Sequence, residues 1–169
     1  MTLKILFTPE QIAARVAAVA AEIISLPEKP DAAAPVLVGA FVFAADLLRA
    51  LSEKGLPLPV EFVWLRSYGA ARTGGSVKVL AGPSDVVRGK RVLLIDGVLD
   101  SGETIATAKA LLLEQGARAV QVAVAVDKQL PHAKAKADFA CFSGVKDFIA
   151  GYGMDDGGAL RGLPYIGAV

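Results

Sequence analysis

Several residue types on which other protein classes depend are scarce in this chain. It has one cysteine, Cys141, so no disulfide can form within the chain and a metal site with two cysteine ligands is excluded. It has one histidine, His132, so a metal centre built from several histidines is excluded as well. The net charge is only +1, which gives no reason to expect a nucleic acid or a membrane surface as a partner.

Long hydrophobic runs are also missing. No uninterrupted apolar stretch approaches the roughly 20 residues that a membrane-spanning helix needs. The apolar run near the N-terminus is too short for a signal peptide, and Pro9 and Glu10 interrupt it. Hydrophobic residues nevertheless make up 54% of the 169 residues, enough to build a sizeable core. We therefore expect one domain over residues 1–169, in a cytoplasmic protein.

Helix-like and strand-like patterns alternate along the chain. Thr8 and Gln11 can form a capping box around Pro9, which predicts the start of the first helix. Alternating strands and helices predict an α/β fold with a mostly parallel central sheet and helices on both faces. In such sheets ligands bind beyond the carboxyl ends of the strands. The later helices are expected at residues 44–51 and 103–115, and the strands at 36–38, 60–65, 77–80, 92–95 and 120–126.

The segment SYGAARTGGS, residues 67–76, interrupts this pattern. It holds three glycines and almost no apolar side chain. The usual connection has a median of about 4–6 residues, and longer ones are often functional lids. We therefore expect a mobile lid here. His132 is expected in a surface loop, and Cys141 is expected to pack within a strand.

The segment VLLIDGVLDSGET, residues 92–104, places two aspartates on the turn between a strand and a helix. Phosphoryl transfer through an aspartyl nucleophile is one chemistry that uses such a turn. In the haloacid-dehalogenase motif, however, the nucleophile lies two residues before Asp-Gly, and that position is Leu94 here. That motif also usually lies near the N-terminus, whereas this segment is in the middle of the chain. Phosphoryl transfer is therefore disfavoured.

Binding of a sugar phosphate at the helix N-terminus is the second chemistry. Gly102 would let the backbone approach a phosphate, Ser101 and Thr104 offer hydroxyls, and the first N–H groups of the helix point at the anion. Asp96 and Asp100 would lie beside the ligand, where carboxylates hold ribose hydroxyls or take a proton. A simple N-cap formed by Asp100 or Ser101 fits the spacing equally well, so both interpretations remain open.

The same segment resembles the phosphoribosyl-pyrophosphate loop of type I phosphoribosyltransferases, in which a hydrophobic strand precedes two acids, two apolar residues and Asp-Thr/Ser-Gly-x-Thr. Further stretches resemble the hypoxanthine-guanine branch of that family. Residues 65–69 with 75–80 are similar to its flexible catalytic loop. The C-terminal purine-binding segment of that branch is similar to residues 138–139, 147–155 and 161–167 of this chain. The resemblance therefore covers nearly the whole chain.

The resemblance implies a type I phosphoribosyltransferase fold with a small hood, formed by the N-terminal residues and about residues 138–169. It implies purine salvage, in which the phosphoribosyl group passes from 5-phosphoribosyl 1-pyrophosphate to hypoxanthine, and also to guanine. The products are the purine nucleotide and pyrophosphate. A Mg²⁺ cofactor and a homodimer or homotetramer are implied too, with no nucleic acid and no membrane as partners.

On the purine side, the resemblance assigns four residues. Asp100 matches the acid near purine N7, which handles a proton. Lys128 matches the lysine that donates a hydrogen bond to the purine 6-oxo group. Phe148 matches the aromatic residue that stacks on the base, and Ile149 matches a position that acts through its backbone carbonyl.

On the phosphate side, the resemblance makes Asp155 a Mg²⁺ ligand and places Asp96 on the ribose hydroxyls and the metal. Arg161 matches an arginine that binds pyrophosphate, where a planar guanidinium suits oxyanions. Ser67 and Tyr68 match the catalytic dipeptide of the lid that closes over the reacting centre. The cradle for the 5′-phosphate is matched by Ser101, Gly102, Glu103 and Thr104.

The chain departs from the family pattern at two positions on the phosphate side. Gly97 replaces the second of two consecutive acids, so Asp96 stands alone. Val38 replaces the lysine that usually precedes Gly39 in the pyrophosphate loop, unless this loop is shortened and the alignment slips. We expect weaker binding of phosphoribosyl pyrophosphate as a result, and we expect Gly97→Asp to tighten it if the backbone does not need a positive φ.

The two departures motivate a rival function from another class, a non-catalytic nucleotide-binding regulator on the same fold. A phosphoribosyltransferase that prefers xanthine is a third possibility, because the residues do not rank the purines.

Overall fold

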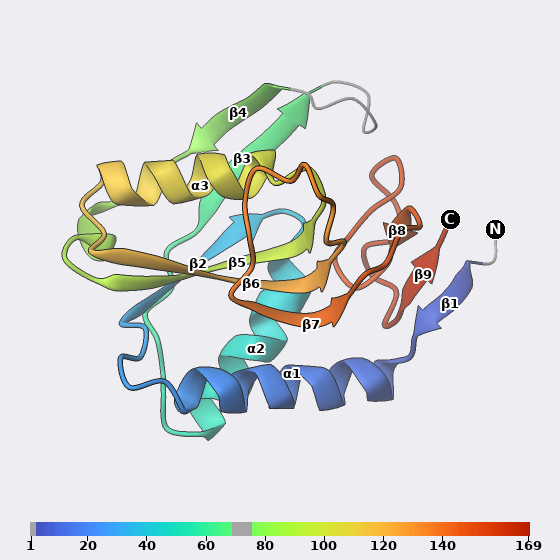
Figure 1. Ribbon diagram of the computed structural model, residues 1–169, viewed down its shortest axis with the longest axis horizontal. Helices are drawn as coiled ribbons and strands as arrows, with labels where there is room; N and C mark the ends of the chain where they lie inside the picture. The colour runs from blue at the N-terminus through green and yellow to red at the C-terminus, as the bar shows by residue number, and fades with distance from the viewer. Residues whose placement is uncertain (1–2, 69–75) are drawn as a thin grey trace.

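A six-stranded sheet with the order β4-β3-β2-β5-β6-β7 runs through the middle of the molecule. This computed structural model describes residues 3–68 and 76–169 (Figure 1). All neighbouring strands of the sheet are parallel except β4, which runs antiparallel to β3, so the prediction of a mostly parallel sheet is confirmed. The strands are β2 (Ala32–Leu37), β3 (Val63–Tyr68), β4 (Ser76–Ala81), β5 (Arg91–Leu99), β6 (Ala119–Asp127) and β7 (Phe139–Ser143).

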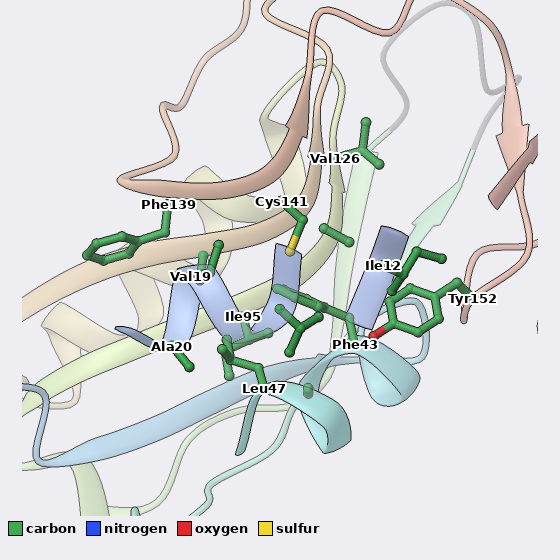
Figure 2. Close-up of a cluster of buried hydrophobic side chains, with 14 of the residues drawn as sticks. Ile12, Val19, Ala20, Phe43, Leu47, Ile95, Val126, Phe139, Cys141 and Tyr152 are labelled. Carbon is green, nitrogen blue, oxygen red and sulfur yellow. The ribbon is translucent and has the colours of Figure 1, made fainter. Parts of the chain in front are cut away.

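Helices cover both faces of this sheet, as the sequence predicts (Figure 1). Along β5, Ile95 packs in a cluster with α1 and α2, whereas Leu94 packs in a second cluster with α3. Figure 2 shows the first cluster, where Phe43 and Leu47 of α2 lie close to Ile95. The helices are α1 (Pro9–Ile24), α2 (Phe41–Glu53) and α3 (Glu103–Glu114), with a short 3₁₀ helix, η1 (Asp85–Val87).

A second, three-stranded antiparallel sheet is formed by the two ends of the chain. Its order is β1-β9-β8, and Figure 1 shows β8 and β9 beyond the carboxyl ends of the central strands. β7, which the sequence assigns to the hood, belongs instead to the six-stranded sheet. The small sheet consists of β1 (Lys4–Phe7), β8 (Ile149–Ala150) and β9 (Ile166–Ala168).

Several predicted boundaries hold and others are wrong. Thr8 caps α1, with its side chain accepting from the Gln11 backbone and its own N–H donating to the Gln11 side chain. The predicted strand 36–38 is instead β2, which begins at Ala32, because a buried central strand needs only small or apolar residues that fit between the two helical layers. The predicted strand 92–95 continues to Leu99. Cys141 is buried in β7 and His132 is exposed, as predicted.

Within residues 3–68 and 76–169, the search for a helix long and apolar enough to cross a membrane finds none.

One side-chain hydrogen bond ties the segment after β8 to α2. The buried Tyr152 hydroxyl donates to Asp46 Oδ2 at 2.6 Å. Burial and the neighbouring carboxylate together raise the pKa of Tyr152 well above its ordinary value. The C-terminal segment is therefore held by a bond whose acceptor carries a charge.

Replacing this tyrosine should destabilise the fold measurably. A hydrogen bond to a charged group is worth about 1.5–3 kcal/mol, and the Asp46 side chain is 35% exposed, so that water replaces part of it. Tyr152→Phe should therefore lower the free energy of unfolding by about 1–2 kcal/mol, measured by urea denaturation. Tyr165→Phe is the control, because that hydroxyl makes no side-chain hydrogen bond to a described residue. An unchanged midpoint for Tyr152→Phe would contradict this assignment.

Candidate active site at the carboxyl ends of the central strands

The pairing of β5 with β6 brings an acid and a lysine together. The two strands run parallel in a register that places Leu99 opposite Asp127, and the Lys128 N–H donates to the Leu99 carbonyl at 3.0 Å. Asp100 and Lys128 follow the two strand ends, and their Oδ2 and Nζ atoms lie 3.0 Å apart. The Lys128 side chain is 9% exposed and that of Asp100 is 49% exposed. The lysine is thus held in place while the carboxylate is open to a ligand.

The start of α3 bears on the two interpretations of the Asp-Ser-Gly turn. Its N-cap is Gly102, with a φ of 79° and no capping side chain of its own, so Asp100 does not cap the helix, whereas the Ser101 hydroxyl accepts a long hydrogen bond from the Glu103 N–H at 3.4 Å. A β-carbon on Gly102 would lie 2.6 Å from the Ala135 nitrogen, so this position requires glycine for space as well as for its left-handed backbone. Apart from the Glu103 N–H, the first turn of α3 offers the backbone N–H groups with which helix N-termini bind anions.

A loop after β6 contacts this turn. The Lys134 N–H donates to the Ser101 carbonyl at 2.8 Å, and the Lys134 ammonium lies 2.5 Å from Glu103 Oε1. Glu103 lies in the first turn of α3, close to any anion bound there. The Lys134 ammonium offsets its negative charge, which would otherwise repel that anion. Sequence reasoning missed Lys134, because a lysine in the run AKAKAD is indistinguishable from an ordinary solvated one.

Asp96 lies deeper in the same region. It is 8% exposed, and its Oδ1 accepts a hydrogen bond from the Gly97 N–H at 2.7 Å. Burial raises the pKa of this carboxyl from 3.8 to about 7. The turn after β2 lies against it, since a β-carbon on Gly39 would lie 3.9 Å from Asp96 Oδ1. Val38, in the same turn, is exposed, and the peptide bond before it is cis.

The lid prediction falls mainly on residues 69–75, which lie outside the described residues. Just before these residues, β3 carries Ser67, whose hydroxyl lies 3.4 Å from that of Thr104 in α3. Tyr68 and Ser76 pair across the start of the β3–β4 hairpin. The base of the predicted lid is thus next to the first turn of α3.

The C-terminal segment contributes an aromatic ring and a further acid. Phe148 is 39% exposed and directly precedes β8, whereas Ile149 is buried in β8. Asp155 Oδ1 lies 2.6 Å from the Arg161 guanidinium, and its Oδ2 accepts from the Gly158 N–H at 2.7 Å. A second guanidinium nitrogen of Arg161 donates to the Gly153 carbonyl at 2.7 Å. The acid and the arginine therefore neutralise each other in this state.

These acids do not form a preformed metal cage. Among residues 3–68 and 76–169, no group of three or more His, Cys, Asp or Glu side chains is arranged to hold a metal ion. Asp96 and Asp155 are separate oxygen donors. Mg²⁺ commonly takes one or two carboxylates and completes its coordination with substrate phosphates and water, so these donors suit it if a phosphate ligand brings the rest.

A separate cavity of about 610 Å³ lies between α1, α2 and residues 161–164. Ile12, Val16 and Val42 contribute apolar walls, and Asp46 and Arg49 form an ion pair at its edge. Apart from Arg161, none of the site residues predicted from the sequence lines this cavity. The polar groups with predicted roles lie instead at the ends of β2, β3, β5 and β6 and in the C-terminal segment.

Comparisons with known proteins agree on one family. The sequence-family model of the phosphoribosyl transferase domain matches residues 3–156 of this chain. The chain is 35% identical to the hypoxanthine-guanine phosphoribosyltransferase of Aquifex aeolicus, over 97% of this chain and 93% of that one. It is 33% identical to the enzyme of the same name from Bacillus subtilis, over 98% and 92% of the two chains. The fold matches a hypoxanthine phosphoribosyltransferase from Staphylococcus aureus with a TM-score of 0.87, at 24% identity and over 98% and 90% of the two chains.

The buried Asp96 should make the ligand-free protein less stable as the pH rises. Its folded-state pKa of about 7 exceeds the ordinary 3.8, so the folded state holds a proton that the unfolded state loses. Stability should fall between about pH 4 and 7 and then level off, with about 1.4 kcal/mol for each unit of pKa difference. Asp96→Asn should remove this slope, so its melting temperature should exceed that of the wild type by more at pH 8 than at pH 5.

Asp147→Asn, at an exposed position, is the control for this comparison. A difference between wild type and Asp96→Asn that stays constant from pH 5 to pH 8 would show that this carboxyl does not titrate in the folded protein near neutral pH.

Proposed function

The chain belongs to the phosphoribosyl transferase domain family, and we propose that it transfers the phosphoribosyl group of 5-phosphoribosyl 1-pyrophosphate to hypoxanthine, with guanine as a second substrate. One observation carries the proposal. The Asp100–Lys128 pair, suited to the edge of a purine, lies directly beside the open N-terminus of α3, which is suited to a phosphate. A nucleotide has both groups at a short separation, and similarity to hypoxanthine-guanine phosphoribosyltransferases extends over 97% of the chain.

On the purine side, an acceptor and a donor are already set beside each other. The Lys128 ammonium donates to the 6-oxo oxygen, and the Asp100 carboxylate accepts the proton at N7. The exposed ring of Phe148 offers a flat apolar surface for stacking on the base. The two charges also hold each other in place before the base arrives, which lowers the cost of ordering them.

On the ribose-phosphate side, the 5′-phosphate binds at the first turn of α3. The backbone N–H groups there donate to it, and the hydroxyls of Ser101 and Thr104 add further donors. Ser67 joins this group through its contact with Thr104. The Lys134 ammonium offsets the charge of Glu103, which would otherwise repel the phosphate.

Pyrophosphate is held at the other end of the sugar by Arg161 and by the turn at Val38 and Gly39. Arg161 is paired with Asp155 in the free state, so it exchanges one oxyanion partner for another when the ligand binds. Asp155 and Asp96 provide carboxylate oxygens for Mg²⁺, which, when bound, neutralises charge on the pyrophosphate. Asp96 also accepts hydrogen bonds from the ribose hydroxyls.

The reaction breaks the bond between ribose C1′ and the pyrophosphate oxygen and forms the bond between C1′ and the purine nitrogen. The electron pair leaves with pyrophosphate, where Arg161 offsets the growing negative charge. The base loses a proton as its nitrogen becomes bonded, and Asp100 takes that proton at N7. The residues from both sides thus hold the two reactants in line, which supplies much of the acceleration.

Homodimer or homotetramer assembly and a cytoplasmic location stay predictions. A preference for xanthine and a role as a non-catalytic regulator are the alternatives, and no contact within residues 3–68 and 76–169 favours either.

Purified protein with Mg²⁺, hypoxanthine and phosphoribosyl pyrophosphate should form inosine monophosphate and pyrophosphate, measured by chromatography of the products. Guanine and xanthine in parallel reactions rank the purines. If long incubation at high enzyme concentration gives no nucleotide from any of the three bases, the catalytic function is wrong and the regulator interpretation takes its place.

Asp100→Asn should slow turnover by about 10²-fold or more, the usual contribution of a general acid–base group. The folded state should survive, because Asp100 is not the N-cap of α3 and its side chain is half exposed. Steady-state kinetics and a thermal melt on the same preparation separate the two effects. Turnover at the wild-type level would mean that this carboxylate only pairs with Lys128.

A further inference from the structure

The carbonyl oxygen of Gly39 lies against two residues that have no side chain. A β-carbon built on Gly97, within β5, would lie 2.8 Å from that oxygen. A β-carbon built on Gly153, in the C-terminal segment, would lie 2.7 Å from the same oxygen. Real carbon–oxygen contacts of this kind fall at about 3.3–3.6 Å. The turn after β2 therefore occupies space that any other residue at 97 or 153 would fill.

The two glycines are required for different reasons. Gly153 has a φ of 96°, so its backbone conformation alone already favours glycine. Gly97 has no positive φ, so its backbone conformation does not by itself favour glycine, and the close contact with the Gly39 carbonyl is the main reason that a side chain does not fit. Met154 also lies close to the Gly97 position, with its Cγ 3.3 Å from the added β-carbon. Gly97 is thus the cleaner reporter of this contact.

We propose that Gly97 and Gly153 are positioning residues that seat Gly39, and with it the Val38–Gly39 turn, against Asp96. The proposal rests on the proposed function, in which this turn and Asp96 bind the pyrophosphate and ribose end of the substrate. β2, β5 and the C-terminal segment meet at this one oxygen, so its position sets the distance between three parts of the site. The glycines act through the turn and touch neither substrate.

This contact changes the meaning of the missing second acid. From the sequence, Gly97→Asp is expected to tighten the binding of phosphoribosyl pyrophosphate if the backbone does not need a positive φ. The backbone does not need it, but the β-carbon of an aspartate would meet the Gly39 carbonyl before its carboxylate reached any ligand. The glycine therefore allows the turn after β2 to pack closely against β5. An aspartate would displace this turn and so weaken the binding of phosphoribosyl pyrophosphate.

The test compares Gly97→Ala with wild type. The added methyl should push the turn away by roughly 0.5–0.8 Å, the difference from an ordinary contact. A misplacement of about 1 Å in a positioned group can lower the reaction rate about 10²-fold. For this smaller shift, in a turn that binds the substrate, we expect the KM for phosphoribosyl pyrophosphate to rise about tenfold. The KM for hypoxanthine should change less than about twofold, because Lys128 and Phe148 lie on other elements and Asp100, beyond the end of β5, is held by its ion pair with Lys128. Gly97→Asp should bind phosphoribosyl pyrophosphate no more tightly than wild type.

A structural readout accompanies the kinetics. The amides of Ala40 and Phe41 donate to the carbonyls of Val36 and Val38, both at 3.2 Å, and they report on the order of the turn. Without ligands, both should exchange hydrogen faster in Gly97→Ala than in wild type. This measurement does not depend on activity, so an inactive wild type would overturn the proposed function while the packing proposal is still tested.

Two glycines elsewhere provide matched controls. Gly82 has no positive φ and no atom within 4 Å of an added β-carbon, so Gly82→Ala matches Gly97→Ala without the contact. Gly55 has a φ of 87° and equally open surroundings, so Gly55→Ala matches the strain of Gly153→Ala without the contact. Both controls should keep wild-type KM values for both substrates. Gly153→Ala should reproduce the selective effect of Gly97→Ala from the opposite side of the turn.

An unchanged KM for phosphoribosyl pyrophosphate in Gly97→Ala would overturn the proposal, as would equal rises in both KM values. Tighter binding by Gly97→Asp would overturn it too. Should Gly97→Ala fail to fold, Gly153→Ala carries the test. If both fail while Gly82→Ala and Gly55→Ala fold normally, the contact is a requirement of folding and the positioning role is wrong.

Discussion

The arrangement of the site depends on the register between two parallel strands. Because β5 and β6 end at the same level, with Leu99 opposite Asp127, the next residue of each chain segment emerges at one edge of the sheet. There Asp100 and Lys128 form an ion pair at 3.0 Å. A slip of one residue would turn the side chains of one strand to the opposite face, and would separate this pair. The two hydrophobic clusters, one on each face of β5, hold that register. The packing of the core therefore also fixes the geometry of the site.

The phosphate side is built differently, from close backbone contacts. Gly102 brings the first turn of α3 against Ala135, and Gly97 and Gly153 admit the Gly39 carbonyl. Such contacts place backbone N–H groups and small turns where a phosphate would bind, beside the hydroxyls of Ser101 and Thr104. The single buried carboxyl of Asp96 has no acidic neighbour in sequence, and burial keeps its pKa near neutrality in the free protein. The phosphate side is therefore tightly packed and its charges are paired within the protein, Lys134 with Glu103 and Arg161 with Asp155. The purine side carries the Asp100–Lys128 pair.

Much of this could be predicted from the sequence, for identifiable reasons. The capping box at Thr8, the alternation of strands and helices, and the aspartates after β5 are local patterns with local causes. The start of β2 at Ala32 could not be predicted in the same way, since alanine has little strand preference and only the two helical layers make it a buried strand. The contacts of Gly39 with Gly97 and Gly153, and of Lys134 with Glu103, join residues far apart in the chain. No single-sequence pattern reports such pairs.

The most direct test of the site is a titration of the wild-type protein with inosine monophosphate, followed through its backbone amide resonances. If the nucleotide binds where the strand ends meet, the largest shifts fall at residues 100–105, at Lys128 and at residues 148–149, which come from separate elements. The same nucleotide should leave α1 and the α2 residues around Asp46 unchanged. Shifts confined to the cavity between α1 and α2 would contradict the account, because they would place the nucleotide away from the Asp100–Lys128 pair and the N-terminus of α3.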